Sequence, residues 1–564
     1  MKRWVVLTKR ADFDAIGNKL RITPMLARIA RNRGLETVAQ IGSFLFGTPD
    51  DLHDPALLPD LETAVMLIKG MIDDGGKIRV IGDYDVDGVC ATYILVRTLS
   101  KLGADVSWQL PDRIRDGYGL NVSIVDQAAA DEISMLLTCD NGIAAVEEIR
   151  HAKELGMCVV VTDHHEPQEN LPPADAIVDP KVTGSTYPFH DICGAFVAYK
   201  LVSRLCTVMQ AQPPSDLLEF AAFATVCDVM PLLDENHILV KYGLEQMKRT
   251  TNLGLNTLID VTGCNRSTLS VYQLGFVLGP CVNATGRLDA AGRALELFLT
   301  DDKRKAAETA QELVKLNESR KNMTESYTRD AVKIVSDGDA NNPVLSQDQV
   351  LVIYLPECHE SLAGIIAGRV RETYYKPTIV LCKAQDMVKG SARSIEAYDM
   401  FAALCDVSEL FIKFGGHKMA AGMSLLEEQI GELRTRLNAA ANLSEEDLTE
   451  KVKIDIAMPM RYATKEFIKE LELLSPYGVG NPTPLFAQKD LVIEKAYVQG
   501  KTRNVVKLRF RNEEADAICF TDGDAFLSEY PIGSRISIVY TPQFNEYMGN
   551  ISTQMLIKEI KPAT

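Results

Sequence analysis

Short apolar segments that each run into an aspartate, with helix-like segments between them, most strongly limit how this chain can fold. They cover residues 77–83, 133–140 and 157–163, with a weaker fourth at 176–179. Apolar strands that alternate with helices predict an α/β fold, a parallel sheet with helices on both faces. Ligands bind outside the carboxyl ends of such strands. We therefore expect Asp83, Asp140 and Asp163, which end three of the strands, to meet at one edge of the sheet.

An acidic turn follows the first strand, where residues 80–88 read Val-Ile-Gly-Asp-Tyr-Asp-Val-Asp-Gly. Asp83, Asp85 and Asp87 alternate along it. Three carboxylates this close repel one another unless they are solvated, protonated or share a cation. Taken alone, a solvated acidic loop is the favoured interpretation. The start of a calcium loop is a weaker alternative, because the remaining ligands and the terminal Glu of such a loop are absent and a strand precedes the turn.

Two histidines and a further acid offer complementary metal ligands. His164 and His165 directly follow Asp163, and imidazole together with carboxylate suits Mn²⁺, Zn²⁺ or Fe²⁺ better than Ca²⁺. The neighbouring acid can orient an imidazole from outside the ligand shell. Asp228 follows an apolar stretch of small residues. On its own, that position is typical of a helix end or a turn.

Length, charge and cysteine use restrict the class of protein. A chain of 564 residues is too long for one core, so three or four domains are expected. A net charge of −17 excludes nucleic-acid binding through a basic field over the whole molecule, so such a site must be local or metal-assisted. The 12 cysteines include no Cys-x-x-Cys pair, which favours reduced core residues over disulfides or a zinc site. Without a signal peptide or a long apolar run, we expect a cytoplasmic protein that does not bind membranes.

Five motifs in a fixed order carry a family resemblance. They lie at Asp83–Gly88, Asp140–Gly142, Asp163–His165, Ile192–Ala195 and Ala224–Leu232. Each motif is weak alone, but the order and spacing of the set resemble the DHH phosphoesterase family. Within that family the chain is similar to the RecJ-type exonucleases, which degrade single-stranded DNA from 5′ to 3′. The resemblance extends from about residue 70 to residue 560.

The resemblance implies a site with two divalent ions, Mn²⁺ being expected and Mg²⁺ the alternative. The metal ligands would be Asp85, Asp87, Asp140, His164 and Asp228, with Asp83 a less direct one. The same residues except Asp83, together with His165, would be catalytic. Two such ions activate a water and stabilise the leaving oxygen of a phosphodiester. Asp140, in the middle of the sheet, is the candidate for a bridging ligand.

Residues 271–290 resemble a family loop that lies against the active site. Asn283 and Arg287 would bind substrate there. Cys281 and His237 stand where the family usually has arginine. Both differences would remove a cation from regions expected near phosphate.

The second half of the chain carries further candidates for phosphate binding. From Ser361 to Arg393 there are six basic side chains and two acidic ones. Residues 389–394 offer Lys, Ser, Arg and backbone N–H groups, the usual phosphate contacts, although a solvated surface with scattered ion pairs is an equal alternative. Residues 414–422 form a glycine-rich loop that resembles the DHHA1 domain. The predicted substrate residues are Arg369, Ser391, Arg393, Gly415, Gly416 and His417.

The expected domain organisation follows from periodicity and from the resemblance. Helical spacing without proline between residues 281 and 342 predicts a long connecting helix. Short alternating strands at the C-terminus predict a β-barrel of the OB type, a common single-strand binder. The expected parts are a peripheral helical segment (1–70), a parallel-sheet DHH domain (71–300), the long helix (301–338), an α/β DHHA1 domain (345–450) and the OB-fold (455–564).

The predicted function is a metal-dependent exonuclease that degrades single-stranded DNA from 5′ to 3′ into 5′-mononucleotides, in DNA repair and recombination. One alternative is a DHH phosphodiesterase for short oligonucleotides or cyclic dinucleotides, and another is a non-catalytic scaffold that binds single strands. The resemblance implies single-strand-binding protein and a RecQ-type helicase as partners. We expect a monomer.

Overall fold

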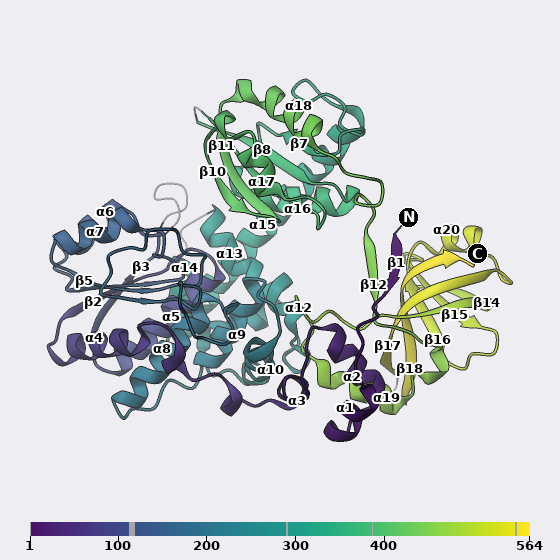
Figure 1. Ribbon diagram of the computed structural model, residues 1–564, viewed down its shortest axis with the longest axis horizontal. Coiled ribbons are helices and arrows are strands. Elements are labelled where there is room, and N and C mark those ends of the chain that lie inside the picture. Colours follow the sequence, from purple (N-terminus) through teal and green to yellow (C-terminus); the bar gives the residue numbers. More distant parts are fainter. Residues whose placement is uncertain (1, 112–118, 289–291, 386, 548–549, 564) are drawn as a thin grey trace. The chain divides into compact units, whose positions relative to one another are not determined.

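The computed structural model describes residues 2–111, 119–288, 292–385, 387–547 and 550–563, without the side chains of residues 287–288, 546–547 and 550 (Figure 1). The chain forms two compact units. One consists of Met1–Val5 and Lys315–Val452, and the other of Val6–Val314 and Lys453–Thr564. Among the described residues, none of the helices combines the length and apolar character that a membrane span requires.

A five-stranded parallel sheet organises the larger unit, in the order β3-β2-β4-β5-β6. Its strands are β2 (Lys77–Ile81), β3 (Asp105–Gln109), β4 (Met135–Cys139), β5 (Cys158–Thr162) and β6 (Ala176–Val178). This confirms the predicted parallel sheet. The edge strand β3 escaped prediction because polar Asp105, Ser107 and Gln109 alternate with its apolar residues, so its apolar signal is weaker than that of a central strand.

Helices cover both faces of this sheet (Figure 1). One core joins α4 (Leu61–Asp73), α5 (Val86–Lys101) and α8 (Gly194–Val208) to strand residues such as Ile78 and Val80. The opposite core joins α6 (Val122–Ala130) and α7 (Val146–Glu154) to Ile81, Leu136 and Val159. The twofold alternation of side chains along a strand produces this division.

A helical layer follows the sheet along the chain. Its members are α9 (Leu217–Cys227), α10 (Asp234–Met247), α11 (Leu253–Val261), α12 (Val271–Gln273), the π-turn η4 (Leu274–Leu278), α13 (Gly279–Leu288) and α14 (Gly292–Leu299). Helix α9 is buried over nearly its whole length and ends at Asp228. Segments α12, η4 and α13 follow one another without a gap.

The C-terminal module is a closed barrel, which confirms the predicted OB-fold. Its strands are β13 (Ile456–Ala457), β14 (Phe486–Gln499), β15 (Val505–Phe510), β16 (Asp516–Phe520), β17 (Arg535–Tyr547) and β18 (Asn550–Pro562). Pairing of β14 with β17 closes the order β13-β14-β15-β16-β18-β17. Along β15, Val506, Leu508 and Phe510 are buried, whereas Lys507 and Arg509 point outward as predicted.

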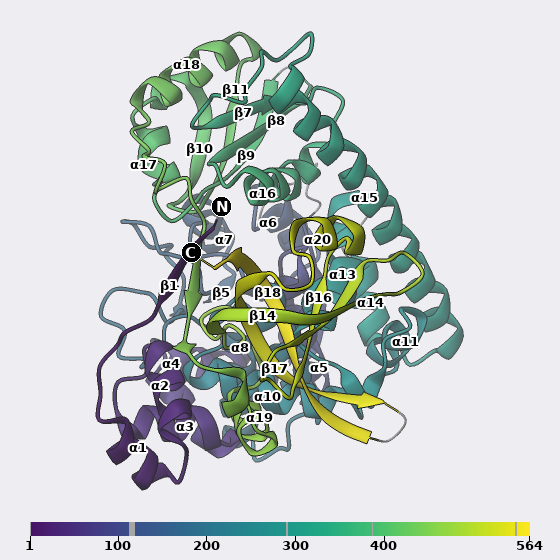
Figure 2. The same cartoon turned by 90° about the vertical axis from the view of Figure 1, so that its right-hand side faces the viewer.

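The N-terminal helices are part of the barrel's core rather than peripheral. Helices α1 (Phe13–Leu20), α2 (Pro24–Asn32) and α3 (Val38–Phe46) lie beside α19 (Lys465–Leu471) in both views (Figures 1 and 2). Leu26 and Phe44 share a buried cluster with Phe486 and Tyr540 of the barrel strands. Arg33, which ends α2, forms a buried ion pair with Asp455, Nη1 to Oδ1 being 2.6 Å.

The smaller unit contains a second sheet, in the order β10-β11-β9-β8-β7. The strands are β7 (Leu351–Tyr354), β8 (Thr378–Ala384), β9 (Met387–Arg393), β10 (Phe411–His417) and β11 (Ala420–Leu425). Helix α16 (Ala363–Tyr374) packs on one face, and α17 (Met400–Cys405) with α18 (Ile430–Ala440) packs on the other. The predicted long helix is α15, which runs from Lys303 to Asp337.

Glu219 places an ionisable carboxyl group inside the buried helix α9. Its Oε1 accepts a hydrogen bond from the Thr250 hydroxyl, and among the described residues its Oε2 has no hydrogen-bond partner. Burial raises the pKa of Glu219 to about 7, although the Thr250 hydrogen bond acts against this and nearby Asp216 adds to it. The folded protein therefore holds a proton here that the unfolded chain releases near pH 4.

We expect this carboxyl to make stability fall with pH. Between about pH 4.5 and 7 the unfolded state binds fewer protons at Glu219 than the folded state, so the free energy of unfolding decreases as pH rises. The loss is about 3 kcal/mol at most. Glu219→Gln removes it, so urea unfolding at pH 5 and pH 8 should show the variant gaining on the wild type at the higher pH. A constant difference between the two proteins would contradict the assignment.

Candidate metal centre

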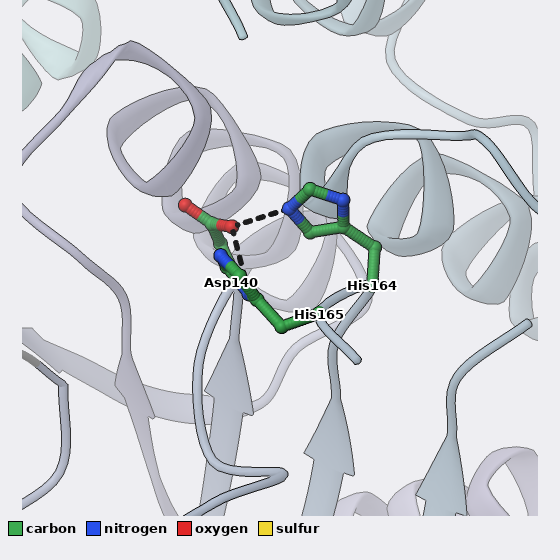
Figure 3. A group of neighbouring side chains, drawn as sticks. All are labelled: Asp140, His164 and His165. Carbon is green, nitrogen blue, oxygen red and sulfur yellow. Dashed lines mark hydrogen bonds and ion pairs between the residues drawn. The ribbon is translucent and has the colours of Figure 1, made fainter. Parts of the chain in front are cut away.

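The carboxyl ends of β4 and β5 bring an acid and two histidines together (Figure 3). Asp140 follows β4, and His164 and His165 follow β5. The Nε2 atom of His164 lies 3.1 Å from Asp140 Oδ1, 3.5 Å from Asp87 Oδ2 and 3.7 Å from Asp228 Oδ2. A single imidazole nitrogen is thus surrounded by carboxylates from three separate segments.

Backbone N–H groups hold two acids of the turn after β2. Asp85 caps α5, its Oδ1 accepting from the Gly88 N–H at 3.1 Å. Both oxygens of Asp87 accept from the first N–H groups of α8, at Gly194 and Ala195, at 2.7 Å each. A helix N-terminus supplies unpaired donors and partial positive charge, so these contacts favour the ionised form of Asp87.

Glycine is required where these segments approach most closely. A Cβ atom at Gly88 would lie 2.4 Å from the backbone nitrogen of Asp83. One at Gly194 would lie 2.7 Å from the Cβ of Asp140. The glycines of the Asp-Gly and Cys-Gly-Ala motifs are therefore steric requirements of the acid cluster.

Two residues of the centre have left-handed backbone. The φ angle of Asp140 is 59° and that of Val229, directly after Asp228, is 61°. Aspartate tolerates this region, but for a β-branched residue it is an outlier. The Val229 side chain is 64% exposed, so burial of that side chain does not account for the strain, and the surrounding fold must impose it.

Burial and mutual repulsion disfavour the charge of three acids. Burial raises the pKa of Asp140 and of Asp228 well above the usual range, and the charges of Asp87 and Asp85 add to both shifts. The pKa of Asp87 is raised by burial too, with His164 acting against the shift. Such a cluster gains from a cation, which removes the cost of keeping the carboxylates ionised.

The two histidines differ in charge because their surroundings differ. Burial lowers the pKa of His164 to about 4, so its ring is neutral at pH 7 and suited to a metal. Burial alone would lower the pKa of His165 as well. A 2.7 Å hydrogen bond to Asp163 and the nearby acids raise it instead, to about 9. The Asp163 contact therefore favours the protonated form of the His165 ring.

The donor atoms fit a divalent metal ion. Three overlapping groups each place their ligand atoms within 4.8 Å of one another, namely Asp83 with Asp85 and Asp140, Asp87 with His164 and Asp228, and Asp140 with His164 and His165. Asp228 Oδ2 and His164 Nδ1 are buried without a hydrogen-bond partner among the described residues. Several carboxylates with one imidazole suit Mn²⁺ or Mg²⁺ better than the softer metals that thiolates select.

The structure brings together every metal ligand expected from the sequence, and it adds Asp163 to the site. Asp163 accepts from the N–H of Ile143 at 2.9 Å and from the His165 ring. It thereby joins the turn after β4 to the histidine pair. From its position at the end of a strand, Asp163 was expected at this edge and as a neighbour that orients an imidazole, and the His165 contact has that form.

Of the predicted substrate residues in the larger unit, Asn283 adjoins the acid turn. Its Oδ1 accepts from the Val86 N–H at 3.1 Å. The side chain of Arg287 lies outside the described residues. Cys281 is buried and donates to the Val277 carbonyl. His237 is buried, stacks on Phe44 and contacts the Leu474 carbonyl. The side chains at 237 and 281 thus serve the core.

In the smaller unit the predicted residues form two rows across three strands. Arg393, Ala420 and His417 are paired in one row, and Ser391, Gly422 and Gly415 in the next row on the same face. Arg393 Nη1 donates to Ser391 Oγ at 3.1 Å. A Cβ at Gly416, whose φ is 151°, would lie 2.4 Å from the Ala420 carbonyl oxygen.

Arg369 is the exception among these residues. It lies half-buried on α16, and within the described structure no recorded contact joins it to Ser391 or Arg393. Arg371, two residues later, is the arginine whose charge lowers the pKa of Arg393, in addition to burial. Helical periodicity alone could not distinguish the two positions.

A parallel sheet whose strand ends gather acids and histidine, followed by a second α/β unit, defines a phosphoesterase of the DHH class. The chain matches the DHH family, N-terminal domain over residues 77–225, the DHHA1 domain over 347–443 and the RecJ OB domain over 454–559.

Relatives place the chain more narrowly. It is 36% identical to the single-stranded-DNA-specific exonuclease RecJ of Bacillus subtilis, over 99% of this chain and 70% of that one. RecJ of Thermus thermophilus in complex with Mn²⁺ matches all of this chain and 80% of its own, at a TM-score of 0.85 and 29% identity. RecJ of Thermus thermophilus in complex with Mg²⁺ matches 100% of this chain and 79% of its own, at a TM-score of 0.77 and 27% identity. The chain belongs to the RecJ family.

Neutralising one acid should stabilise the protein in the absence of metal. Asp140→Asn keeps the shape, suits the left-handed backbone and removes one charge from the cluster. We expect its thermal midpoint in EDTA to exceed that of the wild type, by about 1 kcal/mol or more in stability. Because Mn²⁺ binds the folded state, it should raise the thermal midpoint of the wild type. It should raise the thermal midpoint of the variant far less. Asp126→Asn, which changes an exposed acid paired with His151, is the control and should behave as wild type in both conditions.

Relief of the backbone strain at Val229 should also stabilise the protein, and it should weaken metal binding at the centre. Val229→Gly permits the left-handed backbone without cost and should raise the free energy of unfolding by about 1 kcal/mol. We expect weaker Mn²⁺ binding by calorimetry, because the backbone next to Asp228 is less restrained. Val229→Ala removes the exposed methyl groups but keeps the Cβ, and so should gain less stability. Equal gains in the two variants would show that strain is not the cause.

Proposed function

We propose that this chain is a metal-dependent exonuclease that degrades single-stranded DNA. The observation that carries the proposal is the complete acid and histidine cluster in a chain similar over 99% of its length to a protein named as a single-stranded-DNA-specific exonuclease. The reaction is hydrolysis of a phosphodiester bond.

Each group of the centre then has a role. Asp85, Asp87, Asp140, His164 and Asp228 hold divalent ions, with Asp83 beside them. When bound, the ions supply an activated water and offset the charge of the leaving oxygen. The Asp163 contact favours the protonated form of His165, and its side chain is 44% exposed, so this ring would donate to an oxygen of the reacting phosphate. Asp163 positions this ring through the 2.7 Å hydrogen bond.

The face of Ser391, Arg393 and His417 would bind the terminal 5′ nucleotide. Small residues, Ala420 and Gly422, occupy the strand between the outer two. They leave the face open, and Gly415 and His417 are exposed. Arginine, serine and backbone N–H groups are the usual partners of phosphate. A site for the 5′ end makes degradation proceed from 5′ to 3′ and release 5′-mononucleotides.

The outer face of the barrel would bind the rest of the strand. A cavity of about 230 Å³ is lined by Lys495, Tyr497, Lys507 and Arg509, and Tyr497 is 54% exposed. An aromatic ring between cations suits single strands, whose bases stack and whose phosphates pair. The carboxylate of Asp516 pairs with Lys507 Nζ at 2.7 Å and with Arg509 Nη2 at 3.0 Å. These ion pairs fix the positions of both cations before a strand binds.

Further expectations complete the proposal. A role in DNA repair and recombination and cooperation with single-strand-binding protein and a RecQ-type helicase rest on the family resemblance. We also expect a cytoplasmic location and a monomer. The barrel module argues against an enzyme for dinucleotides, and the complete ligand set argues against an inactive scaffold.

Removal of a metal ligand should abolish hydrolysis without unfolding the protein. We expect Asp140→Ala and His164→Ala each to lower turnover of a 5′-phosphorylated single strand in Mn²⁺ by about 100-fold or more. Asp126→Ala, whose carboxylate pairs with His151 on the surface of the same domain, is the matched control and should retain activity. Wild-type turnover in the ligand variants would reject the assignment.

The direction of degradation has its own test. A strand labelled at its 5′ end should release the label at once as a mononucleotide, whereas a 3′ label should stay on long products until late. Arg393→Ala should slow release of the first nucleotide and should leave Mn²⁺ binding unchanged, because Arg393 is not one of the proposed metal ligands. Early release of the 3′ label would overturn the direction while leaving the hydrolytic assignment intact.

A further inference from the structure

An exposed aromatic pair lies on the helical segment that adjoins the metal centre. Tyr272 and Phe276 are stacked, with ring centroids 5.2 Å apart and planes 22° from parallel. They are 63% and 71% exposed. Exposed rings of this size cost free energy in water unless another molecule covers them.

The segment that carries the pair is fixed to both halves of the acid cluster. Near the start of the segment, the π-turn contacts Cys227, the residue before Asp228. The Cys227 Sγ lies 3.5 Å from the Leu274 carbonyl oxygen. A Cβ at Gly279 would lie 2.4 Å from that sulfur. Farther along, Asn283 binds the Val86 N–H, next to Asp85 and Asp87. The rings are thus held at a set distance from the acid turn.

That distance matches a short stretch of nucleic acid. Seven residues separate Phe276 from Asn283, which corresponds to about 10 Å of helix. Successive nucleotides of a stacked strand rise about 3.4 Å each, so the rings lie about three nucleotides from the acid turn. The π-turn η4 (Leu274–Leu278) interrupts the helix at this point, and such turns are frequent at functional sites.

The surroundings of the pair favour nucleic acid over a protein partner. Tyr272 borders a cavity of about 380 Å³ whose lining also includes Lys241, Lys248, Glu245, hydroxyl groups such as those of Ser270 and Thr483, and apolar residues such as Leu244. Lys248 pairs with Glu245, whereas the recorded contacts of Lys241 are the Leu45 carbonyl and the Tyr242 ring. Cations and hydroxyls beside aromatic rings suit a phosphate backbone with stacked bases. A protein partner would need a wider apolar surface.

We propose that Tyr272 and Phe276 form a stacking platform for bases of the single strand just beyond the scissile phosphate, with Lys241 at the backbone phosphate. This rests on the proposed function, since it assigns part of the same substrate to the platform. The platform is independent of base identity, because every base has a flat face. It therefore strengthens binding and fixes the position of the strand, and it does not select for base sequence.

A protein–DNA double-mutant cycle tests the platform. The proteins are wild type, the double variant Tyr272→Ala/Phe276→Ala, and Tyr462→Ala, which removes a 52% exposed tyrosine elsewhere. Each binds 5′-phosphorylated 12-mers, followed by fluorescence anisotropy in EDTA so that no metal-dependent hydrolysis occurs. One strand is intact, one lacks bases at nucleotides 2–4 and one lacks them at nucleotides 8–10.

The wild type should bind the strand without bases 2–4 about ten-fold more weakly than the intact strand, from the usual value of base–aromatic stacking. The double variant should bind the intact strand about ten-fold more weakly and lose most of its response to the missing bases 2–4. Its response at nucleotides 8–10 should equal that of the wild type. Tyr462→Ala should match the wild type throughout. Circular dichroism and Mn²⁺ calorimetry establish that the double variant is folded with an intact centre.

Two outcomes overturn the platform. If the double variant responds to missing bases 2–4 as the wild type does, the rings do not stack on those bases. If the double variant binds the intact strand as tightly as the wild type, the pair serves another partner, such as a protein. Because this binding assay needs no turnover, its failure is distinct from failure of the exonuclease assignment, which the Mn²⁺ hydrolysis assay decides.

Discussion

Repulsion among carboxylates that the fold has buried at one edge of a sheet is the constraint on which the rest of this structure depends. Asp87, Asp140 and Asp228 come from three separate segments and meet around one imidazole nitrogen of His164. Burial makes their charges costly. The fold keeps them together with N–H donors, closely packed glycines and left-handed backbone, and the balance is completed by a cation. Stability and function therefore act in opposite directions at this edge.

A second layer of helices packs against the acid edge of the sheet. Helix α9 ends at Asp228, and the helical segment that follows η4 contacts the acid turn through Asn283. The sheet edge contributes Asp140 and His164, and the helical layer contributes Asp228 to the same cluster. His237 and Cys281 are buried and are used for packing in that layer.

The sequence allowed the parallel sheet and its acids to be predicted, because burial on both faces leaves continuous apolar runs and ligands follow strand ends. Other features depend on tertiary contacts that no local pattern contains. Strand β3 lies at an edge and alternates like a surface strand. Arg371 rather than Arg369 approaches Arg393, a choice that depends on how α16 is rotated against its sheet. The burial of His237 depends on Phe44, almost two hundred residues earlier.

The cluster that joins Leu26 and Phe44 to Phe486 and Tyr540 has a consequence for synthesis on the ribosome. Helices α2 and α3 emerge long before the barrel strands that cover them. At about 5–20 residues per second, the apolar faces of α2 and α3 wait for tens of seconds. Contacts of such large sequence separation also fold slowly. During that interval the apolar faces of α2 and α3 stay uncovered, so these helices reach their final place long after they are made.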